Sequence, residues 1–214
     1  MKQHKWTFTL ILVTLLLAFS FWGFQKYMNY NTNHIRTEEN GILSTDQSLE
    51  VGQIIDSLNG IYVYYNGSTS NVEGRNIIDG YNVGLKYQCV EFIKRYYYLH
   101  LDHKMTDSYG HAKDFYNSSL SDGEMNPARN LIQYNNPSST KPSENDILIY
   151  KPTAFNQYGH VAIISKVEEN RIQIIQQNPG WNHGVREYYK LKQNADGNWV
   201  IDNGRIIGRL STKK

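Results

Sequence analysis

The chain has very little cysteine: Cys89 is the only one among its 214 residues. A single cysteine excludes an internal disulfide, and a Cys-based zinc site would need more sulfur ligands. The sequence also lacks the H-E-x-x-H type of spacing, so we expect neither a metal nor a cofactor. The chain also carries no large net charge, because its formal net charge is only +2. We therefore expect no nucleic-acid partner, since such proteins need a clustered basic face.

A long apolar run is present near the N-terminus, from Trp6 to Phe24. Its length suits the roughly 20 residues that a membrane-spanning helix needs. Lys2 and Lys5 precede the run, which favours a cytoplasmic N-terminus. A cleaved signal peptide is the alternative, but bulky residues 19–22 stand where small cleavage-site residues would be expected. Either interpretation places the remaining chain outside the cytoplasm, anchored or secreted.

The chain therefore divides into three parts. Residues 1–27 are expected to form a cytoplasmic tip and a transmembrane signal-anchor. Residues 28–50 are polar and are expected to be a spacer. Residues 51–214 are rich in large aromatic and aliphatic side chains, and they are expected to form one folded domain.

Hydrophobic periodicity predicts an α+β domain with its helices first. Apolar residues recur every three or four positions from Cys89 to Leu101, which predicts a helix, and a weaker helix is expected near residues 110–120. Short segments rich in Ile and Val predict an antiparallel sheet, with a hairpin turn at residues 168–170. These predicted strands are residues 147–150, 161–167, 171–177, 186–191, 199–201 and 205–210.

Cys89 and His160 are the candidate catalytic pair. A lone cysteine is more often a small buried hydrophobe, but Cys89 opens a predicted helix. The partial positive charge there should lower the thiol pKa. Backbone N–H groups at Gln88 and Cys89 could also bind an oxyanion. Among the seven histidines, His160 is the candidate base because it opens an apolar strand after Gly159.

A third side chain should orient the imidazole of His160. If the hairpin turn is centred near Glu169, His160 lies roughly opposite Asn178. Strand alternation puts Gln176 on the same face and Gln177 on the other face. Gln176 and Asn178 are both candidates, because a shift of one residue in the register would change the choice.

These residues resemble a known family. The segment Tyr87-Gln88-Cys89-Val90-Glu91-Phe92 is similar to the nucleophile motif of CHAP domains, the cysteine- and histidine-dependent amidohydrolases/peptidases. Within that family it looks most like the amidase domain of glutathionylspermidine synthetase/amidase. The resemblance continues through residues 159–164 and 175–178. It implies a papain-like (NlpC/P60-like) fold, hydrolysis of an amide bond, and Cys89 and His160 as nucleophile and base.

The sequence departs from the glutathionylspermidine-type enzymes at two positions. Those enzymes carry an acidic third residue where this chain has Gln176. They also carry an arginine, implicated in binding a substrate carboxylate, where this chain has Lys94. Lysine is a point charge that cannot make the bidentate contact of arginine. Lys94 is therefore a candidate substrate-binding residue of altered specificity.

Three functions follow as hypotheses. The first is an extracytoplasmic amidase or endopeptidase that cuts peptidoglycan peptides, because the Cys–His pair is expected outside a membrane. The second is a small-molecule amidase acting on a glutathione–polyamine conjugate. The third is a catalytically weak module that binds the cell wall, which the neutral Gln176 would favour.

Overall fold

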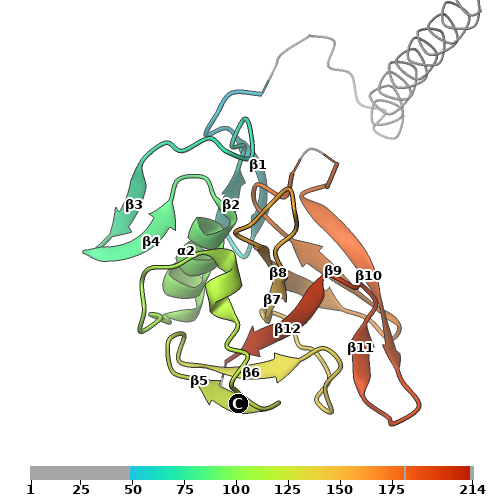
Figure 1. The fold of residues 1–214 in the computed structure, drawn as a ribbon. Helices are drawn as coiled ribbons and strands as arrows, with labels where there is room; N and C mark the ends of the chain where they lie inside the picture. The colour runs from blue at the N-terminus through green and yellow to red at the C-terminus, as the bar shows by residue number, and fades with distance from the viewer. Residues whose placement is uncertain (1–48, 181, 213–214) are drawn as a thin grey trace, which may run out of the picture. The chain divides into compact units, whose positions relative to one another are not determined.

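A computed structural model of the protein describes residues 49–180 and 182–212 (Figure 1). They belong to one compact unit that begins at Ser48. The expected transmembrane helix, and the expected spacer up to residue 48, lie outside the described residues. Within the described part of the chain, no helix is both long and apolar enough to cross a bilayer.

Eight strands form a single antiparallel sheet in the order β11-β10-β9-β8-β7-β12-β6-β5. All six predicted strands and the predicted hairpin are confirmed, with boundaries that agree to within two residues. The strands are β5 (Glu124–Asn126), β6 (Leu131–Asn135), β7 (Ile147–Tyr150), β8 (His160–Val167), β9 (Arg171–Ile175), β10 (Arg186–Gln193), β11 (Trp199–Ile201) and β12 (Ile206–Ser211).

One α-helix, α2 (Cys89–Leu101), packs against this sheet among the described residues, and its predicted bounds are confirmed. The expectation that helices come first is wrong. Two hairpins precede α2, namely β1 (Ile54–Leu58) with β2 (Ile61–Tyr64), and β3 (Arg75–Ile78) with β4 (Tyr81–Leu85). The weaker helix predicted near residues 110–120 is only a short 3-10 turn, η1 (Ala112–Phe115).

Both early hairpins have a local cause that is visible in the sequence. Each pair of strands is joined by two residues, Asn59-Gly60 in the first hairpin and Asp79-Gly80 in the second. All four residues have positive φ, between 48° and 80°. Asn-Gly and Asp-Gly favour this backbone, which matches the twist of two-residue hairpins. The strands were missed because each is only four or five residues long, and because β1, β2 and β3 are only partly buried.

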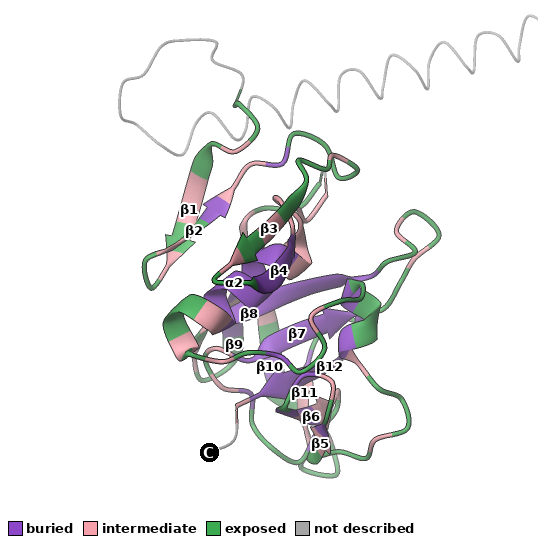
Figure 2. Ribbon diagram, turned by 90° about the vertical axis from the view of Figure 1, so that its left-hand side faces the viewer, coloured by how far each residue is buried: buried purple, intermediate pink, exposed green. Residues whose placement is uncertain are grey.

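The core has two layers, one on each face of the sheet. On one face, fully buried residues of β7 and β8 such as Ile149 and Ile163 pack against Phe92 and Tyr96 of α2. On the other face, Leu148 and its neighbours on β8 to β12 form a second cluster. In Figure 2, β7 is buried along its whole length, and β8 is buried from His160 to Ile164. Burial on both faces explains why these strands read as continuous apolar runs rather than as alternating ones.

Candidate active site

The first turn of α2 holds Cys89 against the sheet. Gln88 is the N-cap and Cys89 is the first helical residue. Strand β4 runs directly beneath this turn, where Gly84 has a φ of +133° and a Cβ would come within 3.0 Å of the Glu91 Cα. Only glycine suits both constraints without displacing the helix. The position of the thiol therefore depends on Gly84 as well as on the helix itself.

His160 reaches Cys89 because it is the first residue of β8. Its register partner is Tyr150 at the end of β7, and its ring lies 5.5 Å from the Tyr150 ring, centroid to centroid. The preceding residue must be glycine, because a Cβ at Gly159 would stand 2.7 Å from the Tyr150 carbonyl oxygen. The backbone N–H of Val161, the next residue, lies near enough to the Cys89 thiol to act against the rise of its pKa. The predicted nucleophile therefore lies beside the start of β8, the strand that begins with the predicted base.

Gln176 is the side chain that contacts the imidazole. Its Oε1 lies 2.8 Å from His160 Nε2, and its Nε2 donates to the Gly184 carbonyl oxygen at 2.8 Å. The second contact fixes the amide orientation, so the oxygen faces the ring. Because that oxygen can only accept, a neutral imidazole carries its proton on Nε2 and keeps Nδ1 as the basic nitrogen. Nδ1 of His160 is therefore the nitrogen that can accept the thiol proton.

Asn178, the other candidate, contacts Gln88 instead of the imidazole. Its side-chain amide donates to Gln88 Oε1 at 2.7 Å and to the Thr69 carbonyl oxygen at 3.1 Å. Gln88 in turn donates its side-chain amide to the Asn71 carbonyl oxygen at 2.7 Å. These contacts tie the end of β9, the N-cap of α2 and the loop before β3 together. Asn178 is thus a positioning residue at the rim of the site.

The expected oxyanion donors are only partly available. The backbone N–H of Gln88 already donates to the Leu85 carbonyl oxygen at 2.9 Å. The side chain of Gln88 is engaged by Asn178 and by the Asn71 carbonyl oxygen. We therefore correct the expectation that Gln88 donates to an oxyanion. The N–H groups of Cys89 and Val90 do face the thiol. Both belong to the first turn of the helix, whose N–H groups have no acceptor within the helix.

Burial makes the resting pair neutral. It raises the pKa of the Cys89 thiol to about 11, and the N–H groups of Val161, Val90 and Cys89 act in the opposite direction. It lowers the pKa of His160 to about 4, against the effect of the Gln176 hydrogen bond. The expected fall of the thiol pKa at the helix N-terminus is thus outweighed by desolvation. At neutral pH the site holds a thiol beside an unprotonated imidazole.

Lys94 does not lie at the site. Its side chain is buried, and its ammonium group donates to the backbone carbonyl oxygens of Asn82 and Ser108. The ammonium also lies 4.9 Å from the centre of the Tyr81 ring. Burial lowers the pKa of Lys94 to about 8. We therefore correct the expectation that Lys94 binds a substrate carboxylate, because its hydrogen bonds join α2 to β4 and to the loop after α2.

Sequence reasoning missed a buried polar cluster behind the nucleophile. Glu91 accepts from Arg95 at 2.6 Å, from Asn76 at 2.8 Å and from Gln177 at 2.9 Å. Gln177 also donates to the Gln88 carbonyl oxygen and accepts from the Tyr64 backbone N–H. The i, i+4 spacing of Glu91 and Arg95 is the signal that could have revealed the pair. The cluster fixes the start of α2 relative to β9.

A carboxylate at position 176 should raise the pKa of His160. In Gln176→Glu, a negative charge about 2.8 Å from Nε2 would favour the imidazolium. We expect the pKa of His160 to rise from about 4 by about 1 to 3 units. An NMR titration of the His160 ring in the full-length chain measures this shift. Gln193→Glu, on an exposed part of β10, is the matched control and should leave the value unchanged; an unchanged value in Gln176→Glu would contradict the prediction.

The arrangement has the parts needed for covalent catalysis by a thiol. The candidate nucleophile starts α2, the candidate base starts β8 and is hydrogen-bonded to Gln176, and N–H groups lie beside the thiol. No cluster of three or more His, Cys, Asp or Glu side chains that could hold a metal ion occurs within residues 49–180 and 182–212. The chemistry that this geometry supports is attack on a carbonyl carbon with loss of an amine.

Comparison with known proteins agrees with the resemblance expected from the sequence. Residues 80–178 match the family described as "CHAP domain". Trypanothione synthetase of Crithidia fasciculata is 31% identical over 129 residues, which cover 59% of this chain and 20% of that protein. Bifunctional glutathionylspermidine synthetase/amidase of Escherichia coli (strain K12) is 33% identical over 106 residues, covering 49% and 17%. The chain thus spans about a fifth of these relatives.

Among solved structures, the crystal structure of Ly7917 with the hydrolyzing product of MDP is similar at 19% identity with a TM-score of 0.35. It covers 58% of this chain and 53% of that one. The family match spans both Cys89 and His160, and it ends at Asn178. Residues 80–178 of the chain are therefore similar to the CHAP domain family over a stretch that includes both predicted catalytic residues.

Proposed function

We propose that the chain is a cysteine amidohydrolase, with Cys89 as nucleophile and His160 as general base. The contact between His160 Nε2 and Gln176 Oε1 carries this proposal, because it leaves Nδ1 basic in a ring that is fixed beside the thiol. The neutral state of both groups means that the proton moves from Sγ to Nδ1 as the sulfur attacks.

The reaction then follows in two balanced halves. Sγ bonds to the amide carbon, and the N–H groups of Cys89 and Val90 face the oxygen that becomes negative. The C–N bond breaks, and the imidazolium of His160 returns its proton to the leaving amine. Water then attacks the resulting thioester with His160 as base, which releases the acid and restores the thiol.

The substrate that we propose is the peptide part of peptidoglycan, cut outside the cytoplasm. Two considerations support it: the amide chemistry of the site, and the topology expected from the apolar run at residues 6–24. An amidase held on the outer side of a bacterial membrane would meet peptidoglycan as its main amide-rich polymer. The chain would be a single-pass membrane protein, or a secreted one if the segment is cleaved.

Loss of the thiol should abolish hydrolysis. Full-length protein in detergent is incubated with purified peptidoglycan of several peptide types, and newly released amino groups are counted. The wild-type chain should release them, and Cys89→Ala should fall to background, because no other side chain at the site supplies a nucleophile. A wild-type chain that binds these polymers without releasing amines would instead favour a binding module.

A small-molecule amidase is the second candidate, and the similarity to a glutathionylspermidine synthetase/amidase favours it. Such an enzyme would cleave an amide between a peptide acid and a polyamine. The same protein is assayed with glutathionylspermidine, and the free polyamine is measured. Turnover of this compound together with inactivity on every peptidoglycan would transfer the proposal to this class of substrate.

A further inference from the structure

A small polar pocket lies against the catalytic imidazole, and the mechanism above uses only His160 and Gln176 among the residues that line it. Its volume is about 40 Å³, which holds one small polar group. The residues that line it come from β7, β8, the loop after β9, β10 and the loop before β12. They are Tyr150, His160, Gln176, Pro179, His183, Tyr189, Asn203 and Arg205.

Arg205 is the charged residue of this pocket that lacks a partner. Its Nε is buried and makes no hydrogen bond with any residue that the structure describes. The guanidinium also forms no ion pair with a described residue, and its nearest aromatic contact is the Tyr150 ring at 5.9 Å. Arg205 as a whole is half-buried, but its buried Nε–H group has no acceptor, which is costly. An acceptor supplied by a ligand would remove this cost.

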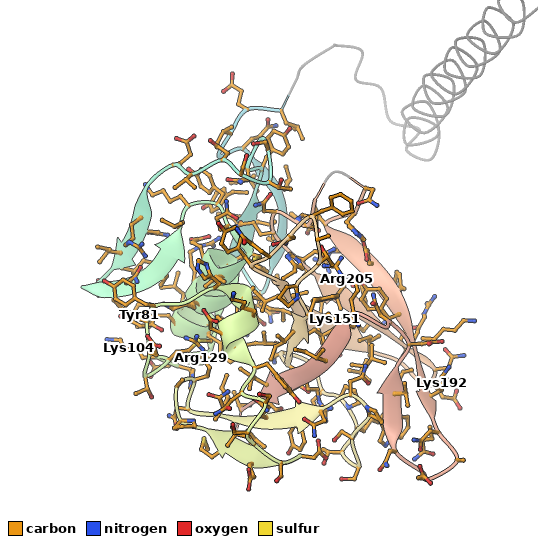
Figure 3. The ribbon with its side chains drawn as sticks, viewed as in Figure 1. Tyr81, Lys104, Arg129, Lys151, Lys192 and Arg205 are labelled. Carbon is orange, nitrogen blue, oxygen red and sulfur yellow. The ribbon has the colours of Figure 1, made fainter. Side chains whose placement is uncertain are left out.

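The acidic group nearest to the pocket is already engaged. Glu187 receives a hydrogen bond from the Tyr189 hydroxyl at 2.5 Å, and its other oxygen lies 2.8 Å from His183 Nδ1. Lys151 is adjacent to Arg205 along the backbone, since its N–H is bonded to the Arg205 carbonyl oxygen at 2.9 Å. Figure 3 shows Arg205 and Lys151 close together, with Lys192 well away from both. Arg205 is the lining residue of the pocket that carries a permanent positive charge.

The mechanism decides which part of a substrate meets this pocket. The carbonyl carbon must lie at Sγ beside the start of α2, and the leaving nitrogen must lie at the imidazole that protonates it. Because the pocket is lined by that imidazole, we place in it the part of the substrate that follows the leaving nitrogen. In an amino acid the carboxylate carbon follows the nitrogen after two bonds of about 1.5 Å each. An α-carboxylate on the leaving residue would thus lie next to the imidazole.

We propose that Arg205 binds a carboxylate on the leaving-amine side of the scissile amide. The preferred substrate is then a peptide cut before a residue with a free α-carboxylate, and an amide whose leaving group is a cationic polyamine is disfavoured by the same charge. This proposal rests on the amidohydrolase function and deepens it, because it separates the two substrate classes that were left open.

The test uses a matched pair of N-acylated peptides that differ only at the C-terminus, as free carboxylate or as carboxamide. The wild-type full-length chain should show a kcat/KM about 10- to 100-fold higher for the carboxylate, as expected for a charge-assisted hydrogen bond. In Arg205→Gln this ratio should fall to about one, and Arg205→Lys should keep part of it. Lys192→Gln, which removes an exposed lysine paired with Asp202, should keep the whole ratio.

Binding to the inactive Cys89→Ala chain separates the two possible failures. Calorimetry with the same two peptides should show the carboxylate bound about tenfold more tightly, and the preference should vanish when Arg205→Gln is added. Equal affinities in Cys89→Ala, or a preference that survives Arg205→Gln, would overturn the subsite whether or not the wild type turns over. Selective binding without any hydrolysis by the wild type would leave the subsite standing and overturn the amidase function.

Discussion

Replacing Glu91 with leucine should lower the free energy of unfolding by about 3 to 5 kcal/mol, because Arg95 would be left as an uncompensated buried charge. The two side chains are 1% and 7% exposed, and their closest atoms are 2.6 Å apart. The substitution would also remove one of the two acceptors of Gln177, whose contacts join α2 to the segment after β9. Chemical denaturation of the full-length chain measures the loss.

Two further variants make this result specific. Replacing both partners, as Glu91→Leu with Arg95→Met, should recover much of the lost stability, since no buried charge then remains. The exposed pair of Lys192 and Asp202 is the matched control, and Asp202→Asn should cost less than about 1 kcal/mol. A loss in Glu91→Leu as small as that control would show that the cluster contributes little to the fold.

Replacing His160 with alanine should reduce kcat/KM by about 10²- to 10⁴-fold, the usual contribution of a general base. Burial of both groups should determine the shape of the wild-type pH profile. Activity requires a neutral imidazole, with a pKa of about 4, beside a thiol with a pKa of about 11. The rate should therefore be flat through the neutral range. It should fall only as the pH approaches about 4, where the imidazole becomes protonated.

His100→Ala is the matched control for this variant. His100 lies near the end of α2 and contacts Asn59, far along the helix from Cys89. It should change kcat/KM by less than about threefold, since surface substitutions have small effects. An acid limb near pH 6.5 in the wild-type profile, the ordinary pKa of histidine, would show that burial does not control the base.

Much of the domain could be predicted because its signals are local. The helix from Cys89 to Leu101 and the β8–β9 hairpin follow from periodicity and from one turn. The hairpin centre near Glu169 also placed Gln176 and Gln177 on opposite faces of β9, and the structure confirms this: Gln176 contacts His160 and Gln177 contacts Glu91.

The remaining features depend on contacts between distant segments. Nothing local distinguishes Gln176 from Asn178, because a backbone bulge between Ile164 and Lys166 shifts the register within the hairpin. The burial that sets the pKa of the thiol comes from packing of the whole sheet. The role of Lys94 was misjudged for the same reason, since its two acceptors lie 12 and 14 residues away in the sequence.

The first hairpin connects the start of the described chain to the alignment of the nucleophile. It is tied to the main sheet through the ion pair of Asp56 with Arg186, and to Gln177 through the Tyr64 N–H. Gln177 also bonds the carbonyl oxygen of the N-cap residue before Cys89. Two hydrogen bonds therefore link β2 to the residue that precedes the nucleophile, so a displacement of this hairpin would be transmitted to the thiol.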